Sequence, residues 1–422
     1  MVKHFKKKIE EIIDEAQERL DIETAQNPEL RRAIKIVEFF LQSTGRVCYG
    51  GQAINAHLPK KDQFYDPERT LPDYDFFSPD GKTDVDSLVK LFKEAGYTEI
   101  SKRIGIHEGT TKIYVNFTAI ADVTQVIPEF YENISSKSVS INGIHYADPI
   151  FLRMMMYLEL SRPRGEVERW DKVYDRLKKL DDAHHLPRCR VIHNRNPSIS
   201  SARPTLVKYM IANRRVFMGA DVELLYKKGT HLRSAQARTR FLLHGNAPVI
   251  FLSPDADMDA DALVQSTLAR KVQITGYQNI LPAMVALYHA EDLIAVIVQE
   301  EACHSFITLP VTKHRQLRVA SLDTILTFLI GLYYRKDAII MPQKSLLCWL
   351  RQYIDLSNWY KAHPTRLIPA FSIECSGYQT TFASLLKAKA ARIEAARQKA
   401  SSGNRMTRKR NSKVRTTRKT LR

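Results

Sequence analysis

The stretch LPDYDFFSPD, residues 71–80, determines how this chain of 422 residues is interpreted. Asp73 and Asp75 are separated by one residue and are followed by aromatic side chains that favour a strand. On a strand, side chains at i and i+2 point to the same face, about 6.5–7 Å apart. Two carboxylates placed in this way can hold a pair of hard cations about 3.5–4 Å apart. The spacing alone is weak evidence, because Asp84 and Asp86 repeat it.

A pair of glycines lies upstream of these aspartates, in YGGQAIN at residues 49–55. Gly50 and Gly51 fall between a predicted strand and a predicted helix start, where backbone amides and the helix N-terminus can receive a triphosphate. A tight turn that requires glycine is the alternative interpretation. Downstream, TAIADVTQV places one acid, Asp122, in an otherwise apolar strand. A buried carboxylate is costly unless it is paired, hydrogen-bonded or bound to metal.

The order of elements predicts a mixed α/β fold. The sequence predicts helices at 2–25, 28–42, 87–95 and 147–162, with strands at 46–49, 73–78 and 111–127, the last of them broken near Thr118. The string FFSPDGKTDVDSLV at 76–89 matches FLSPDADMDADALV at 251–264 in eight of fourteen positions, at an offset of 175 residues. Duplication of one α/β unit explains the match better than shared turn chemistry, which is the alternative.

The most informative feature of the composition is the net charge of +18. Residues 387–422 hold fourteen Lys or Arg and one acid, Glu394. This basic segment lacks the apolar residues that a core needs, so the sequence predicts a disordered tail that binds nucleic acid or directs localisation. The rest of the chain is only mildly basic.

Several other classes of site and location are disfavoured by the sequence. No stretch approaches the ~20 apolar residues of a membrane helix. The five cysteines are scattered, which indicates neither a disulfide framework nor a zinc ribbon and suits a reducing compartment. The run that starts at Asp255 departs from a calcium loop at Ala260 and Ser266. Zinc binding by the trio His185, Cys189 and His193 is disfavoured, because Pro187 breaks the helix that would align it.

The G-G, D-x-D and single-Asp pattern resembles the nucleotidyltransferase superfamily that includes DNA polymerase beta. Three further strings narrow the resemblance: YGGQAINAHLP, FYDPERTLPDYDFFS and LELSRPRGEVERWDKVYDRL, at residues 49–59, 64–78 and 158–177. They are similar to the catalytic subunits of poly(A) polymerases from large nucleocytoplasmic DNA viruses. The similarity covers residues 30–180 well and extends more loosely to about residue 390.

This resemblance implies a role for each residue of the motif. Asp73 and Asp75 would hold two Mg²⁺ or Mn²⁺ ions, and Asp122 would complete the ion next to the attacking hydroxyl. Gly50 and Gly51 would contact the triphosphate of ATP. Further donors to the phosphates are expected from the amides of Gln52 and Asn55 and from the ammonium of Lys172. Arg162 and Arg169 lie in the same basic segment as Lys172, and the alternative interpretation of that segment is a solvated basic helix face.

The function implied by the resemblance is template-independent polyadenylation of RNA 3′ ends. The partners would be an RNA 3′ end, ATP and a second copy of the chain in a homodimer, without a membrane, in the host cytoplasm or the virion. One alternative is another nucleotidyltransferase that adds a different nucleotide or uses a different acceptor. The other is a non-enzymatic RNA-binding scaffold, which is disfavoured because all three carboxylates are present.

The expected fold class is α+β. It comprises a nucleotidyltransferase-type mixed sheet with flanking helices, a second and degenerate domain of the same type, and a helical C-terminal part. The duplication offset places Pro248 opposite Asp73 and Ile250 opposite Asp75, so the second copy lacks both paired ligands. The expected boundaries are N-terminal helices at 1–45, the catalytic domain at 46–185, the second domain with its helical end at 186–385, and the basic tail at 386–422.

Overall fold

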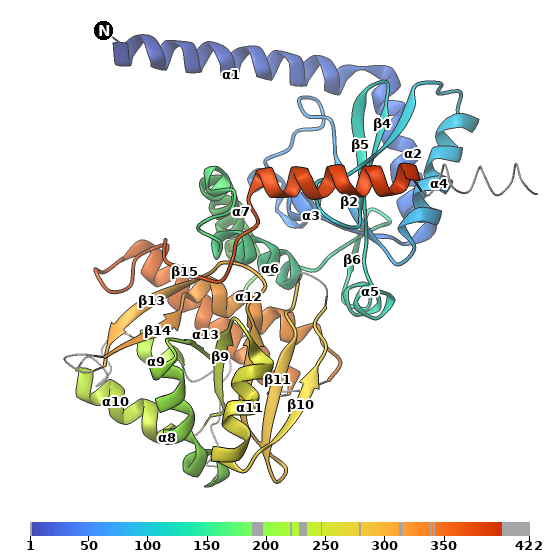
Figure 1. Cartoon of the computed structure of the whole chain (residues 1–422). Coiled ribbons are helices and arrows are strands. Elements are labelled where there is room, and N and C mark those ends of the chain that lie inside the picture. Colours follow the sequence, from blue (N-terminus) through green and yellow to red (C-terminus); the bar gives the residue numbers. More distant parts are fainter. Residues whose placement is uncertain are drawn as a thin grey trace, which may run out of the picture.

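Two mixed sheets, one in each half of the chain, form the frame of the molecule (Figure 1). The computed structural model describes residues 2–398 except 188–196, 220–221, 228–233, 246, 278–279, 312–314, 338–339 and 341. The two halves meet where α6 (Pro149–Leu160) packs against α12 (Leu322–Tyr333). Among the described residues, no helix has the length and apolar character that a membrane span requires.

The first sheet has seven strands in the order β3-β4-β5-β2-β1-β7-β6. These strands are β1 (Val47–Tyr49), β2 (Tyr74–Ser78), β3 (Ile100–Ile104), β4 (Thr110–Val115), β5 (Thr118–Gln125), β6 (Val139–Ile141) and β7 (Ile144–Tyr146). Besides α6, the helices of this half are α1 (Val2–Gln26), α2 (Pro28–Thr44), α3 (Gly50–His57), α4 (Gly81–Glu94), α5 (Pro128–Ser135) and α7 (Trp170–Ala183).

The second sheet has eight strands in the order β10-β11-β12-β9-β8-β14-β13-β15. These strands are β8 (Val216–Met218), β9 (Val249–Ser253), β10 (Arg270–Ile274), β11 (Met284–His289), β12 (Asp292–Gln299), β13 (His304–Pro310), β14 (Gln316–Ala320) and β15 (Cys375–Ser376). Besides α12, its helices are α8 (Pro197–Ala212), α9 (Glu223–Tyr226), α10 (Ala235–His244), α11 (Ala256–Thr267) and α13 (Gln343–Ala362).

The two sheets repeat one topology, and the expected α+β fold class is confirmed. In the first sheet, β2 runs antiparallel to β1 and parallel to β5. In the second, β9 runs antiparallel to β8 and parallel to β12. The register also agrees, because Asp75 pairs with Tyr49 and Asp122 while Ile250 pairs with Met218 and Val296. The second sheet therefore has apolar residues where the first has Asp75 and Asp122.

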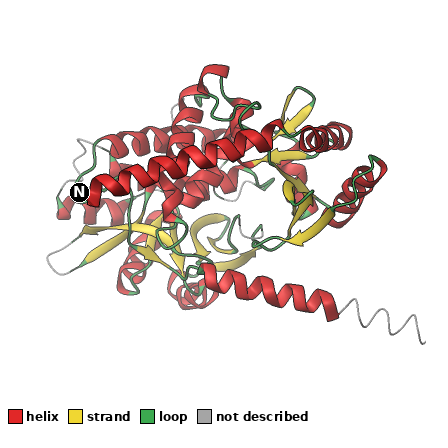
Figure 2. Ribbon diagram, turned by 90° about the horizontal axis from the view of Figure 1, so that it is seen from above, coloured by secondary structure: helices red, strands yellow, loops and turns green. Residues whose placement is uncertain are grey.

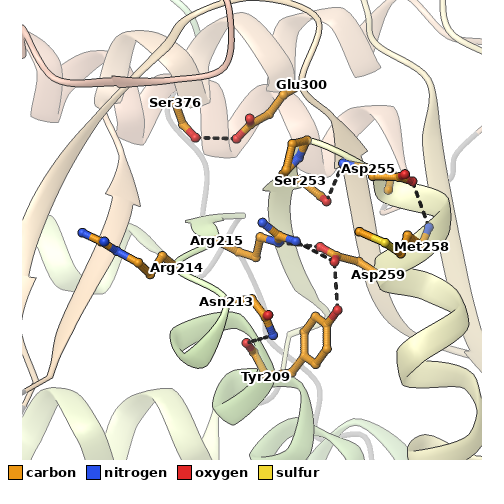
Figure 3. A network of polar contacts seen from close by, with 12 residues as sticks. Tyr209, Asn213, Arg214, Arg215, Ser253, Asp255, Met258, Asp259, Glu300 and Ser376 are labelled. Carbon is orange, nitrogen blue, oxygen red and sulfur yellow. Dashed lines mark hydrogen bonds and ion pairs between the residues drawn. The ribbon is translucent and has the colours of Figure 1, made fainter.

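The acids that the two copies share have structural roles. In the second copy, the Ser253 hydroxyl accepts a bond from the Asp255 amide at 3.0 Å, and Asp255 caps α11 by accepting from the Met258 amide at 3.0 Å (Figure 3). Buried Asp259 accepts from the Arg215 guanidinium at 2.6 and 2.8 Å and from the Tyr209 hydroxyl at 2.8 Å. The repeated acids therefore hold the strand to the helix that follows it.

The first copy contains the same arrangement. Ser78 accepts from the Asp80 amide at 3.0 Å, and Asp80 caps α4 by accepting from the Thr83 amide at 3.2 Å. Buried Asp84 pairs with Arg46 at 2.6 and 3.1 Å. Asp84 is therefore a buried ion-pair partner and not part of a second cation pair. The helix begins at Gly81, earlier than the predicted residue 87, because the Asp80 cap starts it.

A helix at residues 382–398 corrects the expectation that a disordered tail begins at residue 386. Its sequence is rich in Ala, Leu, Lys and Arg, which are strong helix formers. Arg392 anchors it by donating to the carbonyl oxygens of Gly105 and Ile106 at 3.3 and 2.8 Å, in the turn between β3 and β4. The helix crosses the first sheet in Figure 1, where it is red, and lies apart from most other helices in Figure 2. Residues 399–422 lie outside the described part of the chain.

A disulfide between Cys303 and Cys375 corrects the expectation that the cysteines do not pair. Pairing of β13 with β15 sets His304 opposite Ser376 and leaves the two cysteine Cα atoms 5.3 Å apart. The two residues are 72 positions apart in the sequence, so no local spacing indicates the pair.

Candidate active site

The structure brings the three predicted carboxylates together at one end of the first sheet. Asp75 on β2 lies directly opposite Asp122 on β5, and side chains in register on neighbouring strands point to the same face. Asp73 lies two residues before Asp75, just ahead of β2, and is exposed at the rim. Its carboxylate acts electrostatically on Asp75, and that of Asp122 acts on both. The three acids therefore form one electrostatic cluster.

Burial and mutual repulsion make two of these acids hard to ionise. Partial removal of water, together with the negative charge of Asp122, raises the pKa of Asp73 to about 6. Burial raises the pKa of Asp75 to about 7, with further contributions from Asp73 and Asp122. Carboxyls whose pKa values are raised by burial and by neighbouring negative charges are concentrated at cation sites and catalytic sites.

The surroundings of the Asp122 carboxylate indicate whether a cation fits this cluster. Lys112 on β4 forms an ion pair with one carboxylate oxygen of Asp122. The other oxygen, Oδ1, is buried and has no hydrogen-bond partner in the described part of the chain. A bound cation would satisfy this oxygen and relieve the repulsion that raises the two pKa values, so the residues fit a divalent metal.

The cation site is not closed by protein ligands alone. Within the described ranges, no group of three or more Asp, Glu, His or Cys side chains already surrounds one point. Mg²⁺ usually keeps several waters and is held by one or two carboxylates together with substrate phosphates. An open arrangement of Asp73, Asp75 and Asp122 is therefore compatible with metal ions that arrive with a nucleotide.

The turn between β1 and α3 lies against the carboxylate cluster. Gly50 has a φ of +73°, and a Cβ atom placed on it would lie 2.3 Å from the Asp75 Oδ2 atom. A Cβ on Gly51 would lie 2.7 Å from the Tyr65 hydroxyl. The residue before the helix, Tyr49, makes no side-chain cap, so the first amides of α3 are left for another acceptor. A phosphate next to the cations is a suitable acceptor.

Three cations lie on α7 or just before it, and two of them, Arg169 and Arg176, are near the acids or this turn. Arg176 donates to the Tyr65 hydroxyl at 2.9 Å and would lie 3.2 Å from a Cβ on Gly51. The charge of Arg169 acts on Asp75. Lys172 is largely exposed. Partial loss of contact with water, together with the charges of Arg176 and Arg169, lowers the pKa of its ammonium group. The three positive charges are thus close to one another, which is typical of a site for a polyanion.

The remaining predicted contacts have mixed outcomes. Gln52 lies half-buried in the first turn of α3, where a contact with phosphate stays a prediction. Asn55 is buried, and its side-chain oxygen accepts from the amides of Phe64 and Tyr65 at 2.8 and 3.1 Å. It therefore holds the loop that carries Tyr65, and direct contact with a phosphate stays a prediction as well.

Sequence reasoning missed Lys112 and Arg176. Lys112 lies on the strand predicted at 111–127, but only the register of β4 with β5 places it opposite Asp122. Arg176 belongs to the basic segment that was recognised, and its spacing of four residues from Lys172 puts both on one face of α7. The disfavoured zinc trio cannot be assessed, because Cys189 and His193 lie outside the described residues.

The raised pKa values predict how stability depends on pH and metal. The folded protein keeps protons on Asp73 and Asp75 at pH values where an unfolded chain, with a carboxyl pKa of 3.8, has released them. Their contribution to stability is therefore present below pH 4 and is lost as pH rises through 6 to 7. Binding of Mn²⁺ at pH 8 should restore this stability and raise the Tm by about 2–4 °C for each kcal/mol of stabilisation. Thermal unfolding with and without Mn²⁺ measures the effect.

The control for this prediction is Asp75→Asn, which removes one of the two shifted carboxyls. We expect a flatter pH dependence and a smaller Mn²⁺ shift in this variant. An equal Mn²⁺ shift in the variant and the parent protein would show that the ion binds elsewhere.

Comparison with known proteins gives results that agree with this geometry. The sequence profile of the family described as "Poly(A) polymerase catalytic subunit" matches residues 35–166, which contain the glycine pair and all three carboxylates but not Lys172. A mimivirus protein (Acanthamoeba polyphaga mimivirus) assigned as a poly(A) polymerase catalytic subunit is 30% identical over 156 residues. An African swine fever virus protein with the same assignment (isolate Tick/Malawi/Lil 20-1/1983) is 27% identical over 151 residues.

These matches differ in how much of each chain they cover. The mimivirus alignment covers 36% of this chain and 26% of the relative, and the African swine fever virus alignment covers 36% and 31%. A solved structure, the Megavirus polyadenylate synthase, aligns with a TM-score of 0.75 over 94% of this chain and 83% of its own, at 19% identity. The resemblance predicted from the sequence is therefore confirmed: over residues 35–166 this chain is similar to poly(A) polymerase catalytic subunits of large DNA viruses, and over most of its length it shares the fold of a viral polyadenylate synthase.

Proposed function

We propose that this protein extends RNA 3′ ends without a template, transferring AMP from ATP to the 3′-OH with release of pyrophosphate. The observation that carries the proposal is the cluster of Asp73, Asp75 and Asp122 beside the uncapped N-terminus of α3. The sequence matches support it, although they span only about a quarter to a third of the relatives' length. The homologous proteins with this assignment come from large DNA viruses, which favours the host cytoplasm or the virion as the location.

Bound Mg²⁺ or Mn²⁺ would lower the pKa of the primer 3′-OH and neutralise the triphosphate. Asp73 and Asp75 would hold these ions, and Asp122 would contribute its Oδ1 atom, which has no hydrogen-bond partner among the described residues. The first amides of α3, at Gly50 and Gly51, would donate to the phosphates. Arg169, Lys172 and Arg176 would balance the negative charge of the leaving pyrophosphate.

RNA binding is supported by charge. The chain carries 64 Lys and Arg against 46 Asp and Glu, and part of the excess lies on the helix at 382–398. That helix crosses the first sheet and is fixed to it through Arg392. It would present Lys387 and Lys389 to a phosphate backbone. A homodimer is also proposed from the resemblance. The molar mass of the purified protein, measured by light scattering during size-exclusion chromatography, would test it.

Extension of a labelled RNA primer tests the function. Purified protein is incubated with the primer, Mg²⁺ or Mn²⁺, and each of the four NTPs separately. A ladder that appears only with ATP is the expected result. Extension with a different NTP would favour another nucleotidyltransferase, and tight RNA binding without extension by any NTP would favour a scaffold.

A further inference from the structure

A cavity of about 220 Å³ lies at the junction of the two halves. The end of α6 contributes Leu158 and Arg162, and the turn between β3 and β4 contributes His107. The second sheet forms the opposite wall, and the segment at 379–385, which leads into the last helix, closes one side. The cavity is separate from the carboxylate cluster, whose acids are not among its lining residues.

The repeated topology explains why this space is empty in the second half. In the first half, the stacked rings of Tyr49 and Phe77 lie 4.0 Å apart, and Phe151 packs edge-on against Phe77 at 5.7 Å. The strand register makes Met218 and Leu252 the counterparts of Tyr49 and Phe77. Both of these smaller side chains line the cavity.

Two further differences enlarge the space. Phe151 is the third residue after the Asp148 cap of α6, and the third residue after the Ser321 cap of α12 is Thr324. In addition, α5 has no counterpart, because β12 ends at Gln299 and β13 begins at His304. The cavity therefore occupies the place that an aromatic cluster fills beside the carboxylates of the first half.

Three of the residues that line this cavity carry a buried polar atom without a hydrogen-bond partner among the described residues. The lining residues His304, Arg162 and Gln379 each have one buried side-chain atom, Nε2, Nε and Oε1 respectively, that lacks a hydrogen bond in the described part of the chain. His304 is 8% exposed. A buried polar group left unpaired costs about 1–3 kcal/mol. Rotation of these three side chains toward a ligand in the cavity would give each of the atoms a partner.

The protonation of His304 limits the charge of that ligand. Burial, together with the positive charge of Arg162, lowers the pKa of the His304 imidazole to about 4, so the imidazole is neutral at pH 7. Arg162 is then the cation at this wall, and the carboxylate of Glu301 also lines the cavity. A triphosphate is a poor match for one cation beside a carboxylate. The volume is also below the ~300–1,000 Å³ of sites that enclose drug-sized ligands.

A planar ring with donors and acceptors on its edge matches these walls. The Arg162 Nε donates, the Gln379 Oε1 accepts, and a neutral imidazole can do either. Leu252, Met218 and Phe328 offer apolar surface to the faces of such a ring. Nucleobases are recognised in this way, by hydrogen bonds at the edge and packing at the face.

The cavity is also close to the carboxylate cluster in electrostatic terms. Burial lowers the pKa of His107, and the positive charges of Arg162, Arg169 and Lys112 lower it further. Lys112 pairs with Asp122, and Arg169 acts on Asp75. His107 therefore lines the cavity and is also within electrostatic reach of groups near the candidate active site.

We propose that this cavity binds a single nucleobase, and that the degenerate half thereby positions a substrate of the other half. The proposal rests on the proposed function, because the base would come either from the RNA strand near its 3′ end or from a free nucleotide. Gln379 and His304 would read the base edge, and Leu252 would pack against its face.

An abasic scan tests this proposal on the full-length protein. A ten-nucleotide RNA is prepared in versions that lack one base at each of the last six positions, and Kd is measured by anisotropy without metal. AMP binding is measured by calorimetry. If the base belongs to RNA, affinity should fall about tenfold or more at one position, because a stacked base contributes about 1–3 kcal/mol. If it belongs to a nucleotide, AMP affinity should depend on the cavity instead.

Two variants locate the effect. Gln379→Leu removes the acceptor, and Leu252→Phe places the first half's aromatic residue in the cavity. If the base belongs to RNA, both variants should lose the sensitivity to the one abasic position and should have a raised KM for RNA. If it belongs to a nucleotide, both should lose affinity for AMP and should have a raised KM for ATP. In either case kcat should be unchanged. Gln17→Leu on exposed α1 is the matched control and should behave like the parent protein. If Leu252→Phe does not fold, Gln379→Leu decides the test.

The outcomes separate this inference from the proposed function. A protein that extends RNA with ATP, but whose RNA and AMP affinities are the same in Gln379→Leu as in the parent, keeps the function and overturns the nucleobase site. A protein that neither extends RNA nor responds to any abasic position overturns both.

Discussion

Asp75→Ala is expected to lower the rate of RNA 3′ extension by about 10³-fold or more while RNA affinity stays nearly unchanged. Metal ions on the transferring group contribute several kcal/mol to the transition state, and each 1.36 kcal/mol is a factor of ten in rate. The pKa of Asp75 is raised more than that of Asp73, and Asp75 lies in register with Asp122. The substitution removes the carboxylate on which the charges of both Asp73 and Asp122 act. Single-turnover extension of a labelled primer measures the rate.

The matched control is Asp86→Ala, which alters the look-alike pair in the same sequence. Asp86 lies on α4, and its half-exposed side chain pairs with Lys102 at 2.7 Å. Exposed ion pairs contribute about 0–1 kcal/mol, so this variant should extend RNA like the parent protein. Asp73→Ala and Asp122→Ala should resemble Asp75→Ala. Full activity in Asp122→Ala would remove this residue from the proposed set of ligands.

The motif residues were predictable because their chemistry is local in the sequence. The spacing of Asp73 and Asp75, and the isolation of Asp122 in an apolar strand, are visible without a structure. Their convergence depends on β2 and β5 being parallel neighbours in register. The convergence of the three acids was implied by the family resemblance and not by periodicity, because strand order is a long-range property.

Residues that act through long-range pairing were missed for the same reason. Lys112 is one of many lysines until β4 is placed beside β5. The Cys303–Cys375 disulfide depends on β15, a strand of two residues that no pattern indicates. The helix at 382–398 agrees with the expected helical C-terminal part, but most of it lies in the segment assigned to the tail, because the net charge of that segment was weighed above its helix propensity.

The repeat shows which residues of the motif belong to the fold and which to the chemistry. Both halves keep a serine at the end of the strand, an aspartate cap and a buried aspartate paired with an arginine. Only the first half has acids at the positions of Asp75 and Asp122, where the second has Ile250 and Val296. Loss of the acids removes their mutual repulsion, so the second half can use these positions for apolar packing. Its fully buried β9 agrees with this expectation.

Gly50→Ala is the second variant from which a large effect is expected. Its new Cβ would lie 2.3 Å from the Asp75 Oδ2 atom, so the carboxylate must move away. The displaced group is one of the proposed ligands, and a displacement of about 1 Å at such a site can cost about 10²-fold in rate. The variant also places alanine at a φ of +73°, a conformation that costs a residue with a Cβ about 1–2 kcal/mol. Extension rate and thermal unfolding therefore both need to be measured.

Gly45→Ala separates these two effects, because it has the backbone strain without the contact. Gly45 has a φ of +63°, and a Cβ on it would meet no heavy atom within 4 Å. It ends α2 just before β1, so the two glycines flank the same strand. Both variants should lose similar stability, but only Gly50→Ala should lose about 10²-fold in rate at a temperature where both are folded. Equal rates in the two variants would mean that Asp75 tolerates the displacement, and the proposed contact between the glycine turn and the cation site would have to be abandoned.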